Sequence, residues 1–249
     1  MRNIKLTIEY DGTDFEGWQV QRNARRSRTV QDEIQKVLAK LFKEKITLIG
    51  SSRTDSGVHA LGQTANLKTK STHPLAQIKK ALNANLPKDI TIIKVEEVPL
   101  DFHAQFSAKS KTYRYTILNR DAHGALDWRY SLWYPHKLNL KLMREEAKAF
   151  IGRKDFKSFQ GAQTAKQVKN SVRTIKRIDI KKKKDYIYID IEADGFLYKM
   201  VRNIVGTLLA SGSGRLPKGS LKKILAKKDR ACAGPTARPY GLTLLEVKY

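Results

Sequence analysis

The sequence predicts an α+β protein built from two similar halves. Three observations indicate this class: short segments in which apolar and polar residues alternate, helical apolar stripes that follow them, and a repeat of this order later in the chain. Each half is a mixed α/β unit in which we expect an antiparallel sheet, and two such sheets side by side would form a groove. We expect the halves to meet between Pro99 and Ser110, and we place the domains at 1–105 and 106–249.

The elements of the first half follow from periodicity and capping. Apolar residues alternate over 4–10, which predicts a strand with one buried face. Thr29 is a suitable N-cap for a helix over 30–41, whose apolar residues fall on one stripe. A second helix is expected from Pro74 to about Asn85, with proline in its first turn, and a strand over 90–98 follows.

Between these elements lies GSSRTDSGVHA, residues 50–60, which has almost no large apolar side chain. Segments 46–49 and 63–67 are predicted strands on either side of it, so the stretch is expected to form a loop at the edge of a sheet. Its serine, aspartate and glycine are typical of a surface turn. Loops carried on rigid strands are also common places for reacting groups, and at this point both interpretations of Asp55 stand.

The second half is predicted in the same way. Residues 211–220, SGSGRLPKGS, lack the residue order of a phosphate-binding P-loop and are expected to connect two helices. The remaining expected elements are a strand over 111–118, a basic amphipathic helix over about 139–151, a hairpin of 171–180 and 186–194 with Lys181–Lys184 at its turn, an unusually apolar helix over about 198–210, and a closing strand in GLTLLEVKY.

The charge of the chain points to a polyanionic partner. Forty-nine Lys and Arg against 24 Asp and Glu give a formal net charge of +25. We favour nucleic acid over an anionic membrane, because no apolar run approaches the roughly 18 residues of a spanning helix. A merely basic surface is the alternative interpretation.

Cysteine and histidine usage argues against disulfides and structural metals. Cys232 is the only cysteine, and the five histidines are scattered singly, without the spacing of a zinc site. The first residues run directly into a strand pattern without the apolar region of a signal peptide, so we expect a cytoplasmic protein with no metal and no membrane association.

A basic groove and one acid suggest chemistry on a bound nucleotide. The Asp55 carboxylate is suited to act as nucleophile or base at the anomeric carbon of a sugar. A guanidinium would keep it ionised, and Arg202 is a cation within an otherwise apolar helix, although a structural partner such as Glu192 is an equal alternative. Tyr113 and Tyr115 share one face of a predicted strand and could stack exposed bases or simply pack across strands.

The chain resembles the tRNA pseudouridine synthases of the TruA type, with motifs that match in family order over nearly its whole length. The resemblance rests on YDGT with Phe15, GWQ and Gln21, RTD with GVH at 53–59, FHA with FSA at 102–108, Tyr113 with Tyr115, DF with SF at 155–159, RTI at 173–175, GFLY with MVRNIVGT at 195–207, and AGPTA with GL at 233–242.

This resemblance implies the pseudouridine synthase fold with a basic RNA-binding cleft, and isomerisation of uridine to pseudouridine at positions 38, 39 and 40 in the anticodon stem-loop of tRNA. No cofactor or metal is implied, and the family acts as a homodimer. Asp55 matches the catalytic aspartate, Arg202 the arginine paired with it, and Tyr113 the tyrosine that lies on the uracil. Arg53 matches a residue that helps to displace the base. The further residues that match as substrate-binding are Thr54, Val58 and His59.

Three positions depart from the family pattern. Ser52 stands where glycine is usual before the arginine, which implies either that the backbone there needs no positive φ or that the loop is remodelled. Gln105 replaces a usual arginine, and Lys199 a usual histidine. None of these departures touches Asp55, Tyr113 or Arg202, so they bear on the grip on RNA and on the range of sites rather than on the reaction.

Two other functions remain as alternatives. A catalytically silent RNA-binding or tRNA-folding protein would be indifferent to Asp55→Ala. A DNA-binding regulator would show a helix-turn-helix or zinc-finger pattern, and the sequence has no clear one.

Overall fold

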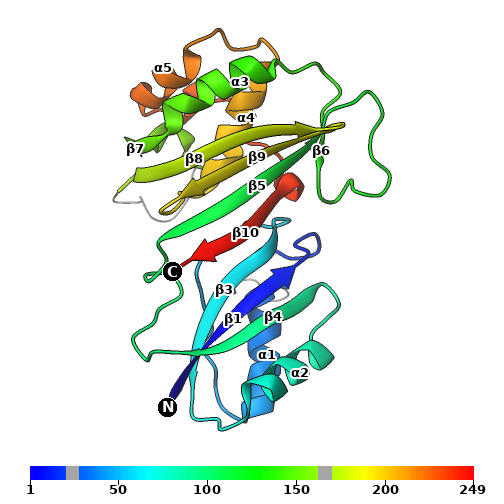
Figure 1. Cartoon of the computed structure of the whole chain (residues 1–249), viewed down its shortest axis with the longest axis vertical. Coiled ribbons are helices and arrows are strands. Elements are labelled where there is room, and N and C mark those ends of the chain that lie inside the picture. The colour runs from blue at the N-terminus through cyan, green and yellow to red at the C-terminus, as the bar shows by residue number, and fades with distance from the viewer. Residues whose placement is uncertain (21–27, 162–169) are drawn as a thin grey trace. The chain divides into compact units, whose positions relative to one another are not determined.

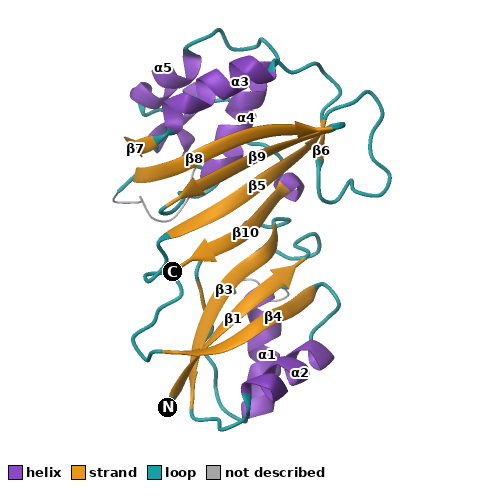
Figure 2. Ribbon diagram, in the orientation of Figure 1, coloured by secondary structure: helices purple, strands orange, loops and turns teal. Residues whose placement is uncertain are grey.

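The computed structural model of the chain describes residues 1–20, 28–161 and 170–249. Gln21 of the family motif and all of the basic tract 22–28 except Arg28 lie outside the described residues. The chain divides into two compact units, Met1–Lys109 with Thr243–Tyr249, and Ser110–Leu242 (Figure 1). Each unit combines a sheet with helices, which confirms the α+β prediction (Figure 2).

The sheet of the first unit has the strand order β4-β1-β3-β10, with β2 beside β3. Strand β1 pairs antiparallel with β3 and β4, whereas β10 joins β3 in parallel. The alternating apolar residues predicted over 4–10 all point into the core. The strands are β1 (Arg2–Tyr10), β2 (Ile49–Gly50), β3 (His59–Thr69), β4 (Ile90–Val98) and β10 (Leu242–Lys248).

Helices α1 (Val30–Phe42) and α2 (Leu75–Asn85) cover one face of this sheet (Figure 2). The side chain of Thr29 caps α1 by accepting a hydrogen bond from the Asp32 amide, as its sequence position predicts. Pro74 precedes α2 at the N-cap. Both helices bury an apolar stripe and expose charge on the other side, so packing rather than propensity alone holds them.

The division into units differs from the sequence-based one at 105/106 mainly at the C-terminus. The closing strand β10 belongs to the first unit because Thr243 and Leu244 pair with His59 and Ala60 of β3. The other boundary lies between Lys109 and Ser110.

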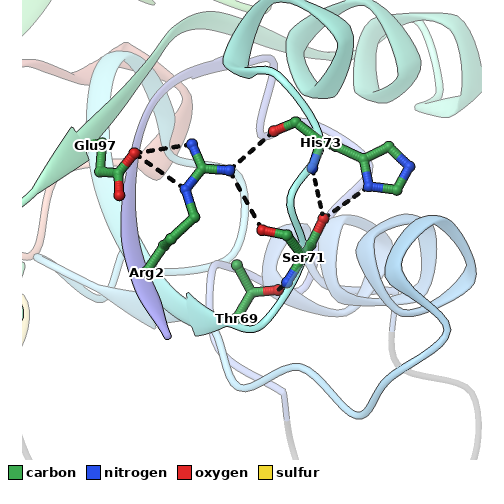
Figure 3. A network of polar contacts seen from close by, with 5 residues as sticks. All are labelled: Arg2, Thr69, Ser71, His73 and Glu97. Atoms are coloured by element: carbon green, nitrogen blue, oxygen red, sulfur yellow. Dashed lines mark hydrogen bonds and ion pairs between the residues drawn. The ribbon is translucent and has the colours of Figure 1, made fainter.

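Arg2 ties the start of β1 to the segment that leads from β3 to α2 (Figure 3). Its guanidinium binds the Glu97 carboxylate at 2.8 Å and donates to the carbonyls of Ser71 and His73. The Ser71 amide in turn donates to the Thr69 hydroxyl, and the Ser71 hydroxyl contacts Nδ1 of His73. This network joins β1, β4 and the segment before α2, and it includes none of the predicted site residues.

The sheet of the second unit runs β5-β9-β8-β7 and is antiparallel, with the short β6 parallel to β5. Helix α4 lies in the core: every residue of it except Arg202 is buried. The elements are β5 (Ser110–Leu118), β6 (Leu132–Trp133), β7 (Gly152–Asp155), β8 (Val172–Lys183), β9 (Tyr186–Ala193), α3 (Leu140–Ala147), α4 (Met200–Gly212) and α5 (Ser220–Lys227), with 3-10 turns at Lys148–Phe150, Lys157–Phe159, Arg230–Cys232 and Pro239–Gly241.

Two local predictions were wrong in part. The strand expected over 46–49 is reduced to Ile49–Gly50, because side chains of α1 satisfy the backbone of Leu48: Gln35 accepts from its amide and Gln31 donates to its carbonyl. The turn expected at Lys181–Lys184 is shorter, since Lys183 still pairs with Tyr186. The turn then needs a left-handed residue, and Lys184 adopts φ 52°.

Other predictions are confirmed. Residues 213–219 connect α4 to α5, and the predicted basic helix is α3 followed by a 3-10 turn. Within the described ranges, no helix has the length and apolar character required to cross a membrane.

Candidate active site

Asp55 lies on the loop between β2 and β3, as the sequence predicts. Its carbonyl accepts a hydrogen bond from the Val58 amide at 3.2 Å, and Gly57 adopts φ 75°, so residues 55–58 form a tight turn. Asp55 is half-buried and Arg53 is exposed. The loop therefore presents one acid and one cation two residues apart.

The segment 10–18 holds the residues on both sides of Asp55. The Trp18 amide donates to the Thr54 carbonyl at 3.2 Å, and the hydroxyls of Tyr10 and Thr54 are 2.8 Å apart. On the other side, Ser56 donates its hydroxyl to the Phe15 carbonyl, and the Gly57 amide donates to the same oxygen. The YDGTDF and GWQ motifs thus serve as a backing for the loop, a role that sequence reasoning missed.

Two glycines of this backing permit its close approach. A Cβ on Gly17 would lie 2.6 Å from the Thr54 carbonyl oxygen, and one on Gly12 would lie 2.0 Å from that of Val58. Gly17 also has φ 99°, which L side chains rarely adopt. Any side chain at either position would displace the backbone that carries Asp55.

The other residues predicted to bind substrate from this loop are turned inward. Thr54, Val58 and His59 have exposures of 8%, 1% and 4%. The imidazole of His59 accepts the Gly12 amide at Nδ1, 3.0 Å away, and the same nitrogen lies 3.1 Å from a carboxylate oxygen of Asp11. The substrate contacts expected of these three residues remain predictions, while their contacts within the unit are clear.

Ser52 fits the loop without strain. Its φ is not positive, and its carbonyl accepts a hydrogen bond from the Gln63 amide group at 2.8 Å. Gln63 also accepts from the hydroxyl of Ser51, so the strand β3 fixes this entry to the loop. Of the two explanations for the missing glycine, the structure favours a backbone that needs no positive φ.

In the second unit, the two tyrosines of β5 have different environments. Tyr115 is fully buried and donates its hydroxyl to the Arg238 carbonyl at 2.7 Å, and burial raises its pKa well above the ordinary value. Tyr113 has 6% exposure and makes an edge-to-face contact with Phe196, with ring centroids 5.1 Å apart. Tyr115 is therefore the packing residue of the pair, and Tyr113 is the candidate for contact with a base.

Lys111 lies on the same face of β5, two residues before Tyr113. It has 9% exposure, and desolvation lowers its pKa from 10.5 to about 8. A lysine this buried is unusual, and the sequence signal that could have revealed it is its place in the alternating apolar pattern of KTYRYTIL.

Arg202 is held by a reciprocal pair of hydrogen bonds to Ala237. Its Nε donates to the Ala237 carbonyl at 2.7 Å, and the Ala237 amide donates to the Arg202 carbonyl at 3.1 Å. Gly206 permits this contact, because a Cβ there would meet the Pro235 carbonyl oxygen at 1.7 Å. The AGPTA motif thus acts as a brace for the arginine. Glu192, the alternative partner, accepts from Ser110 and lies 3.9 Å from Arg177.

Asn203 organises this brace and was also missed from sequence. Its side chain donates to the Phe159 carbonyl at 2.7 Å and accepts from Thr236 at 2.6 Å and from Arg230 at 3.1 Å. The residue is fully buried, so each of these bonds replaces water that it has lost. A polar residue in the otherwise apolar run MVRNIVG was the available signal.

Lys199 directly precedes α4 in a left-handed conformation, with φ 55°. Its ammonium group lies 4.9 Å from the centre of the Tyr198 ring. Gln105, by contrast, is simply exposed. In the described part of the chain no group of three or more His, Cys, Asp or Glu side chains is placed to hold a metal ion.

Each unit thus carries part of the predicted constellation. The first unit brings together Asp55, Arg53, Thr54, Val58 and His59. The second unit carries Tyr113 and Arg202.

Comparison with known proteins agrees with these motifs. A family model described as tRNA pseudouridine synthase matches residues 6–107 and 147–249. The tRNA pseudouridine synthase A of Clostridium acetobutylicum is 46% identical over 249 residues, and tRNA pseudouridine synthase A 2 of Clostridium perfringens is 48% identical. The tRNA pseudouridine synthase A of a Thermoanaerobacter species is 44% identical, and all three alignments cover 100% of both chains. The chain therefore belongs to the tRNA pseudouridine synthase family and is an enzyme of the isomerase class.

Proposed function

We propose that this enzyme converts uridine to pseudouridine at positions 38, 39 and 40 in the anticodon stem-loop of tRNA, with Asp55 as the catalytic nucleophile or base. The observation that carries the proposal is the setting of Asp55. Its neighbours on both sides are bonded to the 10–18 segment, while Asp55 itself is only half-buried. A reacting group needs this combination of a fixed backbone and an accessible side chain.

The reaction exchanges one bond to the sugar for another. The bond from N1 of uracil to C1′ of the ribose breaks, the base turns, and a bond from C5 to C1′ forms; C5 then loses its proton and N1 gains one. As a nucleophile, Asp55 would attack C1′ and be displaced again by C5. As a base, it would remove the C2′ proton, give a glycal, and return the proton when C5 adds. In both routes the carboxylate must be ionised at the start.

The other residues have supporting parts in the proposal. Arg202 favours the ionised carboxylate and orients it, since an opposite charge stabilises the charged form. Tyr113 lies against the uracil and takes part in removing the C5 proton. Arg53, exposed on the loop, assists in displacing the target base, for which unstacking costs a few kcal/mol.

Positive charge supplies the affinity for tRNA in this proposal. With a net charge of +25, the protein attracts phosphates, and each phosphate neutralised should contribute about 0.7 to 0.9 to the slope of log affinity against log salt. We also propose that the enzyme is cytoplasmic and that it acts as a homodimer. The family resemblance implies the homodimer, which light scattering of the purified protein tests.

The decisive experiment compares wild type, Asp55→Asn and the control Asp101→Asn on unmodified tRNA. Asp101 is an exposed acid of the same unit, so its variant matches the loss of charge. Mapping of pseudouridine should show modification at 38–40 by wild type and Asp101→Asn and none by Asp55→Asn, with tRNA binding retained in all three. Modification elsewhere by wild type would refute the position, and activity in Asp55→Asn would refute the role of the acid.

A further inference from the structure

The imidazole of His59 lies at a junction between the Asp55 loop and its backing. It is the first residue of β3 and is buried. Its Nδ1 is 3.0 Å from the Gly12 amide nitrogen and 3.1 Å from Oδ1 of Asp11. An amide can only donate, so the Gly12 bond is one that Nδ1 accepts through a lone pair, as in a neutral ring with its hydrogen on Nε2.

The bond from Gly12 to His59 controls the backbone next to Asp55. Gly12 approaches Val58 so closely that a Cβ would stand 2.0 Å from the Val58 oxygen, and the Val58 amide donates to the Asp55 carbonyl. A shift of Gly12 would therefore reach Asp55 through one residue and one hydrogen bond. On the other side of Gly12, Oδ1 of Asp11 accepts hydrogen bonds from the amide and the hydroxyl of Thr13, which fixes the turn at 11–13.

We propose that His59 is a positioning residue for the isomerisation, and that its neutral form is the active one. Neutral Nδ1 accepts the Gly12 amide and keeps the turn at 11–13 against Val58. Protonation makes Nδ1 a donor, so its hydrogen bond passes to the Asp11 carboxylate, the Gly12 amide loses its acceptor, and the Asp55 loop loosens. The inference rests on the proposed role of Asp55 and adds a pH-dependent control of the same site.

The charged neighbours of His59 decide the direction of the pH effect. Asp11 faces Nδ1 from the loop after β1, and its negative charge favours the protonated ring. Tyr10, at the end of β1, forms a hydrogen bond with Thr54 through its hydroxyl. Strand β10 places Thr243 beside His59, and a threonine side chain does not titrate. Turnover should therefore fall on the acid side, and Asp11→Asn should move that fall to lower pH.

The experiment measures single-turnover rates and tRNA affinity over roughly pH 5 to 8 for wild type, His59→Ala, His59→Asn and Asp11→Asn. His59→Ala should lower the rate about 10- to 100-fold, the scale expected for a displacement near 1 Å, with unchanged affinity. His59→Asn places an amide oxygen close to the position of Nδ1, so it should restore most of the rate and remove the acid fall that this histidine causes. Asp11→Asn keeps a side-chain oxygen that can accept from Thr13, so it should only shift the acid-side fall in rate to lower pH.

Several results would overturn the inference. A wild-type rate and profile in His59→Ala, an unchanged acid fall in His59→Asn, or a loss of affinity equal to the loss of rate would each exclude a positioning role. If His59→Ala does not fold, the profiles of the Asn variants decide. Wild type without synthase activity would instead refute the proposed function, whereas an active wild type with an inactive Asp55→Asn and a normal His59→Ala would refute the positioning role alone.

Discussion

Replacing Gly17 by alanine should slow the isomerisation without weakening tRNA binding. The new Cβ would lie 2.6 Å from the Thr54 oxygen and 3.2 Å from both the Asp55 carbonyl carbon and the Ser56 nitrogen. Ordinary van der Waals contact begins at 3.4 Å, so the Thr54 carbonyl must retreat by about 0.8 Å. Because a misplacement of about 1 Å can reduce a rate on the order of 10²-fold, we expect the rate to fall by about 10- to 100-fold.

A matched control separates this displacement from backbone strain. Gly214 also has a positive φ, 78°, but a Cβ there would meet nothing within 4 Å. Both alanine variants should lose about 1–2 kcal/mol of stability from the left-handed conformation. Only Gly17→Ala adds overpacking, which typically costs a further 1–3 kcal/mol.

The assay follows directly from the reaction. C5 of the target uridine loses its hydrogen, so tritium release from tRNA labelled at C5 reports single turnovers, and filter binding gives the affinity. Thermal melting gives the stability, with about 2–4 °C expected per kcal/mol for a chain of this length. Equal rates in Gly17→Ala and Gly214→Ala would show that the 10–18 segment does not control the position of Asp55.

Three further variants test the second unit. Tyr115→Phe removes the hydrogen bond from the buried Tyr115 to the Arg238 carbonyl and should cost about 0.5–1.5 kcal/mol in denaturant unfolding while the rate is kept; a slower rate at unchanged stability would contradict the packing role. Burial lowers the pKa of Lys111 from 10.5 to about 8. Between these two pH values the unfolded chain binds more protons than the folded one, so the stability of the fold should rise with pH across this range. Lys111→Met should abolish this rise in stability, and a rise that persists in the variant would show that another group causes it. Lys199→Gly relieves a left-handed lysine and should add about 1 kcal/mol while reducing the salt slope of tRNA binding by about 0.7 to 0.9; an unchanged slope would exclude a phosphate contact.

The elements that the sequence predicted best are those set by local chemistry. Alternation located β1, and the Thr29 cap located the start of α1. The failures have long-range causes. The strand expected at 46–49 shortened because glutamines of α1 satisfy the backbone of Leu48, a partnership that no local pattern shows. Likewise β10 joined the first unit through pairing with a strand far away in the sequence.

The candidate site shows the same division. The family motifs indicated Asp55, Tyr113 and Arg202 by type and order, and the structure places each on the expected element. They did not reveal what the surrounding motif residues do. These residues make backbone contacts that a residue pattern does not encode, such as Gly206 against Pro235.

These contacts suggest that rate and affinity are controlled by different groups in this enzyme. The backbone around Asp55 is fixed by glycine approaches and by the His59 bond, none of which adds charge toward solvent. Arg53 and Lys199 carry positive charge and make few of these contacts. Changes to the first group should then alter the single-turnover rate at constant affinity, and changes to Lys199 should alter salt-dependent affinity. Arg53 is the informative exception: if it displaces the base, its loss should reduce turnover more than binding, whereas a pure loss of affinity would reduce it to a phosphate contact and leave base displacement to other residues.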